Sequence, residues 1–287
     1  MDALLDSLAA ERGRIADLVA EGRLDQAAFR ARHLADRHGA NESCAADAAL
    51  LEWLRDLALH RDRPAPWREA FREGNVRSKN ASAPVAAAVR RHLARGLVRA
   101  SDAVEGRGGF LDGEPVGAWL LEAGLVEEAA ASLFASLARA PTSGRAALLL
   151  GNALFRLERV EEARDAWRRA LRVAPTEIVL AEIEDEEVRG LADLADEFDL
   201  HGDVRAWIPV LGFLEDVLPL SALDPVPGAG FGDATRAYDL LIAHKGARSH
   251  GERTAIRRDL KELAPALFEA LLAARKLDAV PTPTGNA

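Results

Sequence analysis

The sequence predicts an all-α fold, an α-solenoid of helical hairpins closed by capping helices. The chain has 287 residues, of which 49% are hydrophobic but only 5% are aromatic. Much of the apolar content is alanine, so we expect many thin helix–helix contacts rather than one thick aromatic core. Valine, isoleucine and threonine are sparse, which argues against a large sheet. The third observation is a residue pattern that recurs after 34 positions.

Helical periodicity begins near the N-terminus and continues almost to the end of the chain. Apolar residues at three- and four-residue spacing predict a hairpin over residues 8–40, with its turn at Gly22. A second candidate pair joins a helix over 45–59 to a short helix over 66–73, where Pro66 suits a first helical turn.

Polar and glycine-rich stretches separate the next elements. A polar stretch over 74–82 precedes a long alanine-rich helix over 84–104, and residues 105–114, with four glycines, are interpreted as a linker. Pro265 is expected to kink the last helix. Beyond the linker we expect hairpins over 115–140, 144–174 and 186–219, and then a strong break over 224–232. Two helices over 233–246 and 254–276 and a tail over 281–287 follow.

The recurring pattern consists of two small residues, one large apolar residue and one proline at constant offsets. The small residues let two helices approach closely, the large residue fills the gap beside them, and the proline ends the second helix. The two clearest copies are Gly117, Ala129, Leu133 and Pro141, and then Gly151, Ala163, Trp167 and Pro175.

This pattern resembles the tetratricopeptide repeat, a helix–turn–helix of about 34 residues. The resemblance is closest over 144–177 and 110–143, and it extends to 188–221 and 8–40. Residues 41–109 diverge from it, and the ten-residue excess between the prolines at 175 and 219 is interpreted as an insertion. We therefore predict three parts: divergent hairpins over 1–109, repeats over 110–221, and capping helices with a flexible tail over 222–287.

The resemblance implies a protein-binding function. Repeats of this family stack so that the first helix of each pair lines a concave groove, which binds a peptide or helix of another protein. The expected function is thus a non-catalytic adaptor or scaffold, in which arginine and asparagine grip carboxylates or backbone carbonyls. The expected groove residues are Arg145, Leu149, Asn152, Arg156, Arg189, Asp193 and Asp196. The alternative is that each is an ordinary solvated polar residue.

A different class of function is kept as the alternative, an enzyme or an anion- or nucleotide-sensing module with an unrecognised C-terminal site. Basic side chains surround a helix start there, where free backbone N–H groups attract anions. These residues are Lys245, Arg248, Arg253 and Arg257. The histidines form no H-E-x-x-H motif and Cys44 has no CxxC partner. We therefore expect no catalytic residues, no metal and no cofactor.

Charge and hydropathy limit the partners. The formal net charge is −9, and it is unevenly distributed: residues 61–109 have 11 basic and 5 acidic residues, a net of +6, whereas 110–200 have 9 and 19, a net of −10. Arginines at 90, 91, 95 and 99 are not interleaved with aromatic residues, so nucleic-acid binding is not expected.

The remaining expectations concern location and assembly. The longest stretches without a charged residue have ten residues, too few to cross a bilayer. The acidic start of the chain is unlike a secretory signal, so a cytoplasmic location is expected. The final helix has an apolar stripe that caps the solenoid or, as the alternative, mediates self-association; it comprises Ile256, Leu260, Leu263, Leu267, Leu271 and Leu272.

Overall fold

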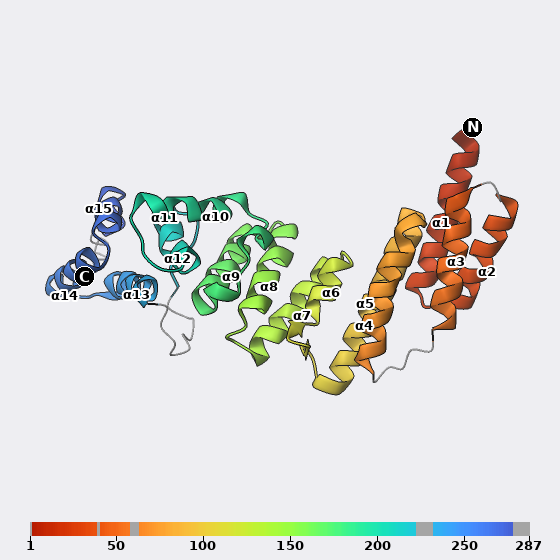
Figure 1. The fold of residues 1–287 in the computed structure, drawn as a ribbon, viewed down its shortest axis with the longest axis horizontal. Coiled ribbons are helices and arrows are strands. Elements are labelled where there is room, and N and C mark those ends of the chain that lie inside the picture. The colour runs from red at the N-terminus through yellow and green to blue at the C-terminus, as the bar shows by residue number, and fades with distance from the viewer. Residues whose placement is uncertain (1, 39–40, 58–62, 222–231, 278–287) are drawn as a thin grey trace, which may run out of the picture. The chain divides into compact units, whose positions relative to one another are not determined.

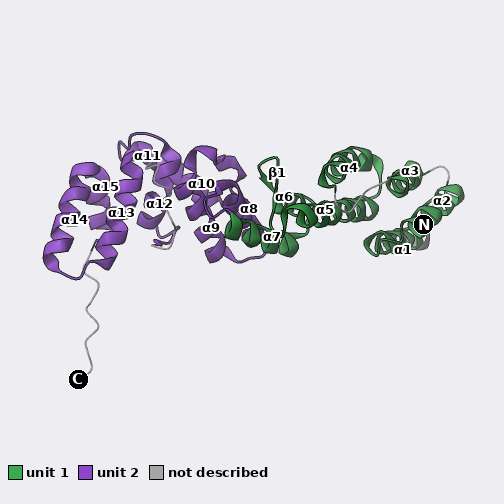
Figure 2. Ribbon diagram, turned by 90° about the horizontal axis from the view of Figure 1, so that it is seen from below, with its two compact units in different colours: residues 1–139 green, residues 140–287 purple. Residues whose placement is uncertain are grey.

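The computed structural model describes residues 2–38, 41–57, 63–221 and 232–277. These residues are mostly helical, with a single short hairpin of strands among them (Figure 1), which confirms the all-α prediction. The chain divides into two compact units, residues 1–139 and 140–287 (Figure 2). The three-part division stays a prediction, as does the solenoid arrangement. None of the described helices is both long and apolar enough to cross a membrane.

The first unit consists of seven α-helices and one short hairpin of strands within its described residues. Gly22 has a φ of 75° at the turn between the first two helices, which confirms the turn predicted there. The elements are α1 (Asp2–Ala20), α2 (Leu24–Arg37), α3 (Glu42–Asp56), α4 (Pro64–Arg77), α5 (Ala83–Glu105), β1 (Phe110–Leu111), β2 (Glu114–Pro115), α6 (Gly117–Glu122) and α7 (Val126–Arg139).

The polar stretch predicted over 74–82 is partly helical, so this prediction was wrong for its first half. Helix α4 continues to Arg77 and is followed by a 3₁₀ turn at Ser78–Asn80. Gly74 is buried where α4 packs on α5, and a Cβ there would lie 2.7 Å from Leu93 Cδ1. The glycine permits close helix packing at this position and does not end the helix.

The predicted linker over 105–114 is also ordered. Strands β1 and β2 pair antiparallel, with Phe110 opposite Pro115. Asp112 and Gly113 both have positive φ, 54° and 83°, as a tight two-residue hairpin requires. Gly108 packs against α7, since a Cβ there would lie 2.4 Å from the Ala135 carbonyl carbon. The glycines thus shape a fixed connection.

Helices α6 and α7 form the first of two hairpins that share one packing arrangement. A Cβ on Gly117 would lie 2.7 Å from Leu133 Cγ, and Ala129 is fully buried beside them. In the second unit, a Cβ on Gly151 would lie 2.3 Å from the Trp167 indole nitrogen. The predicted contact between a small residue and a large one sixteen positions later is confirmed in both hairpins.

The second unit begins with that hairpin, α8 (Gly144–Arg156) and α9 (Val160–Val173). The first helix of the hairpin expected over 186–219 is broken into α10 (Glu186–Gly190), a 3₁₀ turn at Leu191–Asp193 and α11 (Leu194–Glu197). Its second helix is α12 (Val204–Leu214).

The C-terminal helices are α13 (Gly232–Gly246), α14 (His250–Leu263) and α15 (Pro265–Ala273). The single kinked helix expected over 254–276 is therefore two helices. Ala264 precedes proline and is extended, with φ −147° and ψ 80°, so α14 ends before it and Pro265 begins α15. Within the unit, Leu260, Leu267 and Leu271 are fully buried. The predicted break over 224–232 lies almost wholly outside the described residues, and the predicted tail over 281–287 lies entirely outside them.

Candidate functional site

The strongest candidate site is one face of α8. The Ser143 side chain accepts a hydrogen bond from the Ala146 N–H and caps the helix start. Four of the predicted groove residues follow at three- or four-residue spacing and therefore share one side of the helix. We call them the α8 face: Arg145, Leu149, Asn152 and Arg156.

A segment of the same chain lies along this face. Residues 178–185, the covering segment, follow a 3₁₀ turn at Pro175–Glu177, contain a second 3₁₀ turn at Leu180–Glu182 and lead into α10. Ile178 lies near the start of α8, because a Cβ on Gly144 would be 3.5 Å from Ile178 Cδ1. Ile178 and Ile183 are both fully buried and anchor the segment. The insertion expected between the repeats is therefore packed against α8.

The polar side chains of the α8 face all bind the covering segment. Arg145 forms an ion pair with the Glu182 carboxylate, and Asn152 Nδ2 donates to the Glu182 carbonyl oxygen at 2.8 Å. Arg156 donates from Nε and Nη2 to the Glu184 carboxylate at 2.9 and 2.6 Å. Asn152 is held in place by Trp167 Nε1, which donates to its Oδ1 at 3.0 Å. The face thus binds both backbone and carboxylates.

The end of the covering segment is tied to α9. Asp185 is buried, caps α10 by accepting from the Glu187 N–H at 2.9 Å, and pairs with Arg164 at 3.0 Å. The pairing of Glu182 and Glu184 with α8 was not expected from the sequence.

The remaining predicted groove residues do not join the α8 face. Arg189 binds the Ile183 carbonyl oxygen and pairs with Glu186 at 3.4 Å. The side chains of Asp193 and Asp196 are exposed and form no hydrogen bond or ion pair with the described residues. The helix expected to carry these residues is broken into α10 and α11. Leu149, the apolar member of the α8 face, is buried.

Two arginines of the basic patch at the start of α14 form hydrogen bonds within the chain. Arg253 donates to the Ala247 carbonyl oxygen at 3.2 Å, and Arg257 Nε donates to His244 Nε2 at 3.2 Å. Glu252 accepts from the backbone N–H groups of Arg248 and Ser249, and these bonds lower the pKa of its carboxyl. Two backbone donors just before the start of α14 are thus bound by Glu252, and the anion-binding site stays a prediction. Lys245 and Arg248 have exposed side chains.

We predict that His244 makes the second unit less stable in mild acid. Its side chain is buried, and burial together with Arg257 and Arg253 holds its pKa below the usual 6.5. Below pH 6.5 the unfolded chain therefore binds a proton that the folded chain does not, so the unfolding free energy falls as pH falls. His244→Gln keeps an acceptor for Arg257 but does not titrate. The unfolding free energy of this variant is therefore expected to fall less steeply with pH than that of wild type. The difference in slope corresponds to a fraction of one bound proton.

Urea denaturation of the full chain at a series of pH values from 7 down to about 5 checks this prediction. His250→Gln serves as the matched control, because the His250 side chain is exposed. Equal pH slopes for wild type and His244→Gln would contradict the assignment.

Comparisons with models of known families, with curated proteins and with solved structures find no match to the chain. The resemblance to tetratricopeptide repeats therefore remains an inference from its residues. Within the described part of the chain, no group of three or more His, Cys, Asp or Glu side chains is arranged to hold a metal ion.

Proposed function

We propose that the protein is a non-catalytic binding scaffold, built of tetratricopeptide-like hairpins, whose α8 face takes an acidic segment of a partner protein. The observation that supports this function is the set of bonds between the α8 face and residues 182–184 of the chain itself. A face that holds one acidic segment has the chemistry to hold another of the same pattern.

The proposed recognition has a sequence-independent part and a selective part. Asn152 donates to a backbone carbonyl, which any extended peptide offers. Arg145 and Arg156 bind carboxylates two residues apart, one at the end of the 3₁₀ turn Leu180–Glu182 and one two residues later. Ile183 lies between them and is buried. The preferred partner segment therefore has an acidic, an apolar and an acidic residue in succession.

The ion pairs themselves are a small barrier to exchange of the covering segment for a partner segment. The Arg145–Glu182 and Arg156–Glu184 pairs are partly exposed, and such pairs each contribute only about 0–1 kcal/mol. The larger contribution comes from buried Ile183, so a partner must offer an apolar residue in its place as well as the same polar bonds. The covering segment then acts as a built-in competitor, tethered at high effective concentration.

A labelled peptide tests the proposal. We expect a fluorescent peptide with the sequence of residues 176–187 to bind the double variant Glu182→Lys, Glu184→Lys about tenfold more tightly than wild type, because the charge reversal repels the competitor. Fluorescence anisotropy measures the affinity. In a second double variant, Arg145→Glu and Arg156→Glu with the covering segment unchanged, the reversed face repels both the segment and the acidic peptide, so binding of the acidic peptide is expected to be abolished. A peptide carrying lysine at both acidic positions is expected to bind this second variant.

Glu177→Lys is the matched control, since Glu177 is exposed and outside the covering segment. This variant has the same kind of charge change and is expected to bind the peptide as weakly as wild type. A double variant that keeps its helical circular dichroism yet binds no peptide would overturn the proposal.

A further inference from the structure

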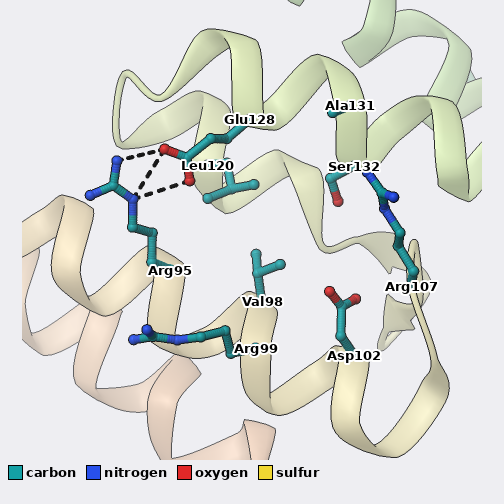
Figure 3. A pocket seen from close by; sticks show the side chains of 9 residues that line it. All are labelled: Arg95, Val98, Arg99, Asp102, Arg107, Leu120, Glu128, Ala131 and Ser132. Atoms are coloured by element: carbon teal, nitrogen blue, oxygen red, sulfur yellow. Dashed lines mark hydrogen bonds and ion pairs between the residues drawn. The ribbon is translucent and has the colours of Figure 1, made fainter.

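The first unit contains a cavity of about 330 Å³ that the proposed function does not use. It lies among α5, α6, α7 and the loop after α5, all within residues 1–139. Its size is at the lower end for ligand pockets. The lining residues are Arg95, Val98, Arg99, Asp102, Arg107, Leu120, Glu128, Ala131 and Ser132 (Figure 3).

The cavity has two polar ends and an apolar middle. In Figure 3, Arg95, Arg99 and Glu128 lie at one end. Asp102, Ser132 and Arg107 lie at the other end, and Val98 and Leu120 lie between the two. Such a lining fits a small molecule with a polar group at each end and a short aliphatic part.

Several polar atoms of the cavity have no partner among the described residues. Asp102 Oδ1 and Ser132 Oγ are buried atoms without a hydrogen bond, and the exposed side chain of Arg99 forms no hydrogen bond or ion pair with the described residues. Arg95, by contrast, is bound to the Glu128 carboxylate through Nε and Nη2. Buried polar groups are nearly always bonded in folded proteins, so these two atoms are available to bond a molecule that enters the cavity.

Among the cavity's side chains, the Asp102 carboxyl is a group whose charged form is disfavoured by burial. Its burial raises its pKa, although a Gly108 backbone hydrogen bond and the charges of Arg107 and Arg139 act in the opposite direction. At neutral pH the ionised carboxylate is therefore held in surroundings that disfavour its charge. A ligand N–H or O–H donor at Oδ1 would compensate it, and sites of this kind cluster where proteins bind ligands.

We propose that this cavity binds a small oxyanion that carries a hydrogen-bond donor at its other end. The carboxylate or phosphate group lies at Arg99, whose guanidinium is free to form a bidentate pair. The amino or hydroxyl donor binds Asp102 Oδ1 and Ser132 Oγ, and the aliphatic part contacts Val98 and Leu120. The binding site involves neither the α8 face nor the covering segment.

Probes that differ at one end only test this assignment. We expect γ-aminobutyrate, γ-hydroxybutyrate or phosphoethanolamine at about 1 mM to raise the melting temperature of the full-length protein and to bind in calorimetry. Butyrate lacks the donor and butylamine lacks the anion, so each is expected to bind at least about tenfold more weakly than the matching two-ended probe. Comparison of the carboxylates with the phosphate ester shows which oxyanion the cavity prefers.

Two variants and a control complete the test. Arg99→Gln is expected to weaken the two-ended probe about tenfold, whereas Arg91→Gln, an exposed residue of the same helix outside the cavity, is expected to have no effect. Asp102→Asn is expected to weaken the probe and to raise the melting temperature of the free protein, because it removes the buried charge. Absence of binding by all three probes at about 10 mM, or equal binding by Arg99→Gln and wild type, would overturn the proposal.

Discussion

Replacing Trp167 with alanine is expected to lower the unfolding free energy of the second unit by about 3–5 kcal/mol, the largest effect in α8 and α9. Trp167 is fully buried, its indole lies directly against Gly151, and its ring centre is 5.5 Å from that of Phe155. The substitution leaves a cavity between the two helices. It also frees the Asn152 side chain, which Trp167 Nε1 holds toward the covering segment.

Urea denaturation of the full chain measures this effect, and hydrogen exchange of residues 144–173 localises it. Trp167→Phe keeps an aromatic ring but not the N–H donor, so it separates the loss of volume from the loss of the bond to Asn152. Val179→Ala, at a side chain 54% exposed in the same unit, is the control and is expected to change the stability by less than about 0.5 kcal/mol. A cost below about 1 kcal/mol for Trp167→Ala would mean that α8 and α9 do not pack as described.

Asp47→Ala is expected to destabilise the first unit by about 3–5 kcal/mol, because it removes the buried acceptor of three bonds and leaves the partly buried Arg12 without its counter-ion. The Asp47 side chain is fully buried and accepts from Arg12 Nε at 3.2 Å. It also accepts from the Ser82 N–H at 2.7 Å and from Ser82 Oγ at 2.8 Å. One carboxylate thus joins α1, α3 and the start of α5.

Hydrogen exchange of peptides from α1, α3 and α5, together with urea denaturation, checks the expected loss. Asp47→Asn keeps one acceptor oxygen and is expected to fall between wild type and Asp47→Ala. Asp56→Ala, at an exposed carboxylate on the same helix, is the control and is expected to stay within about 0.5 kcal/mol of wild type. If the two alanine variants were equally stable, Asp47 would not be the link that its three bonds indicate.

The helices could be predicted because their signals are local. Apolar spacing and the glycine at 22 determine the α1–α2 hairpin. The pattern of small and large residues correctly predicted the close contacts of Gly117 with Leu133 and of Gly151 with Trp167. Each of these signals depends on residues that are close in sequence or one hairpin apart.

Glycine and proline gave the sequence predictions that were wrong. Gly74 lies inside α4 because Leu93 occupies the space that a side chain would need, and Gly108 contacts α7 in the same way. Pro265 begins a helix, whereas a kink was expected. The same residue type breaks, bends or permits close packing according to its neighbours, and those neighbours are distant in sequence.

The sequence by itself determined the helical class, the positions of most helices and the pairing of α6 with α7 and of α8 with α9. Only the tertiary structure decided which polar residues have partners. The arginines and the asparagine of α8 were expected to face a partner protein, but Glu182 and Glu184 of the same chain bind them. The cavity beside Asp102 likewise depends on three helices meeting. Helix formation depends on neighbours in sequence, whereas the pairing of charges depends on which surfaces folding brings together.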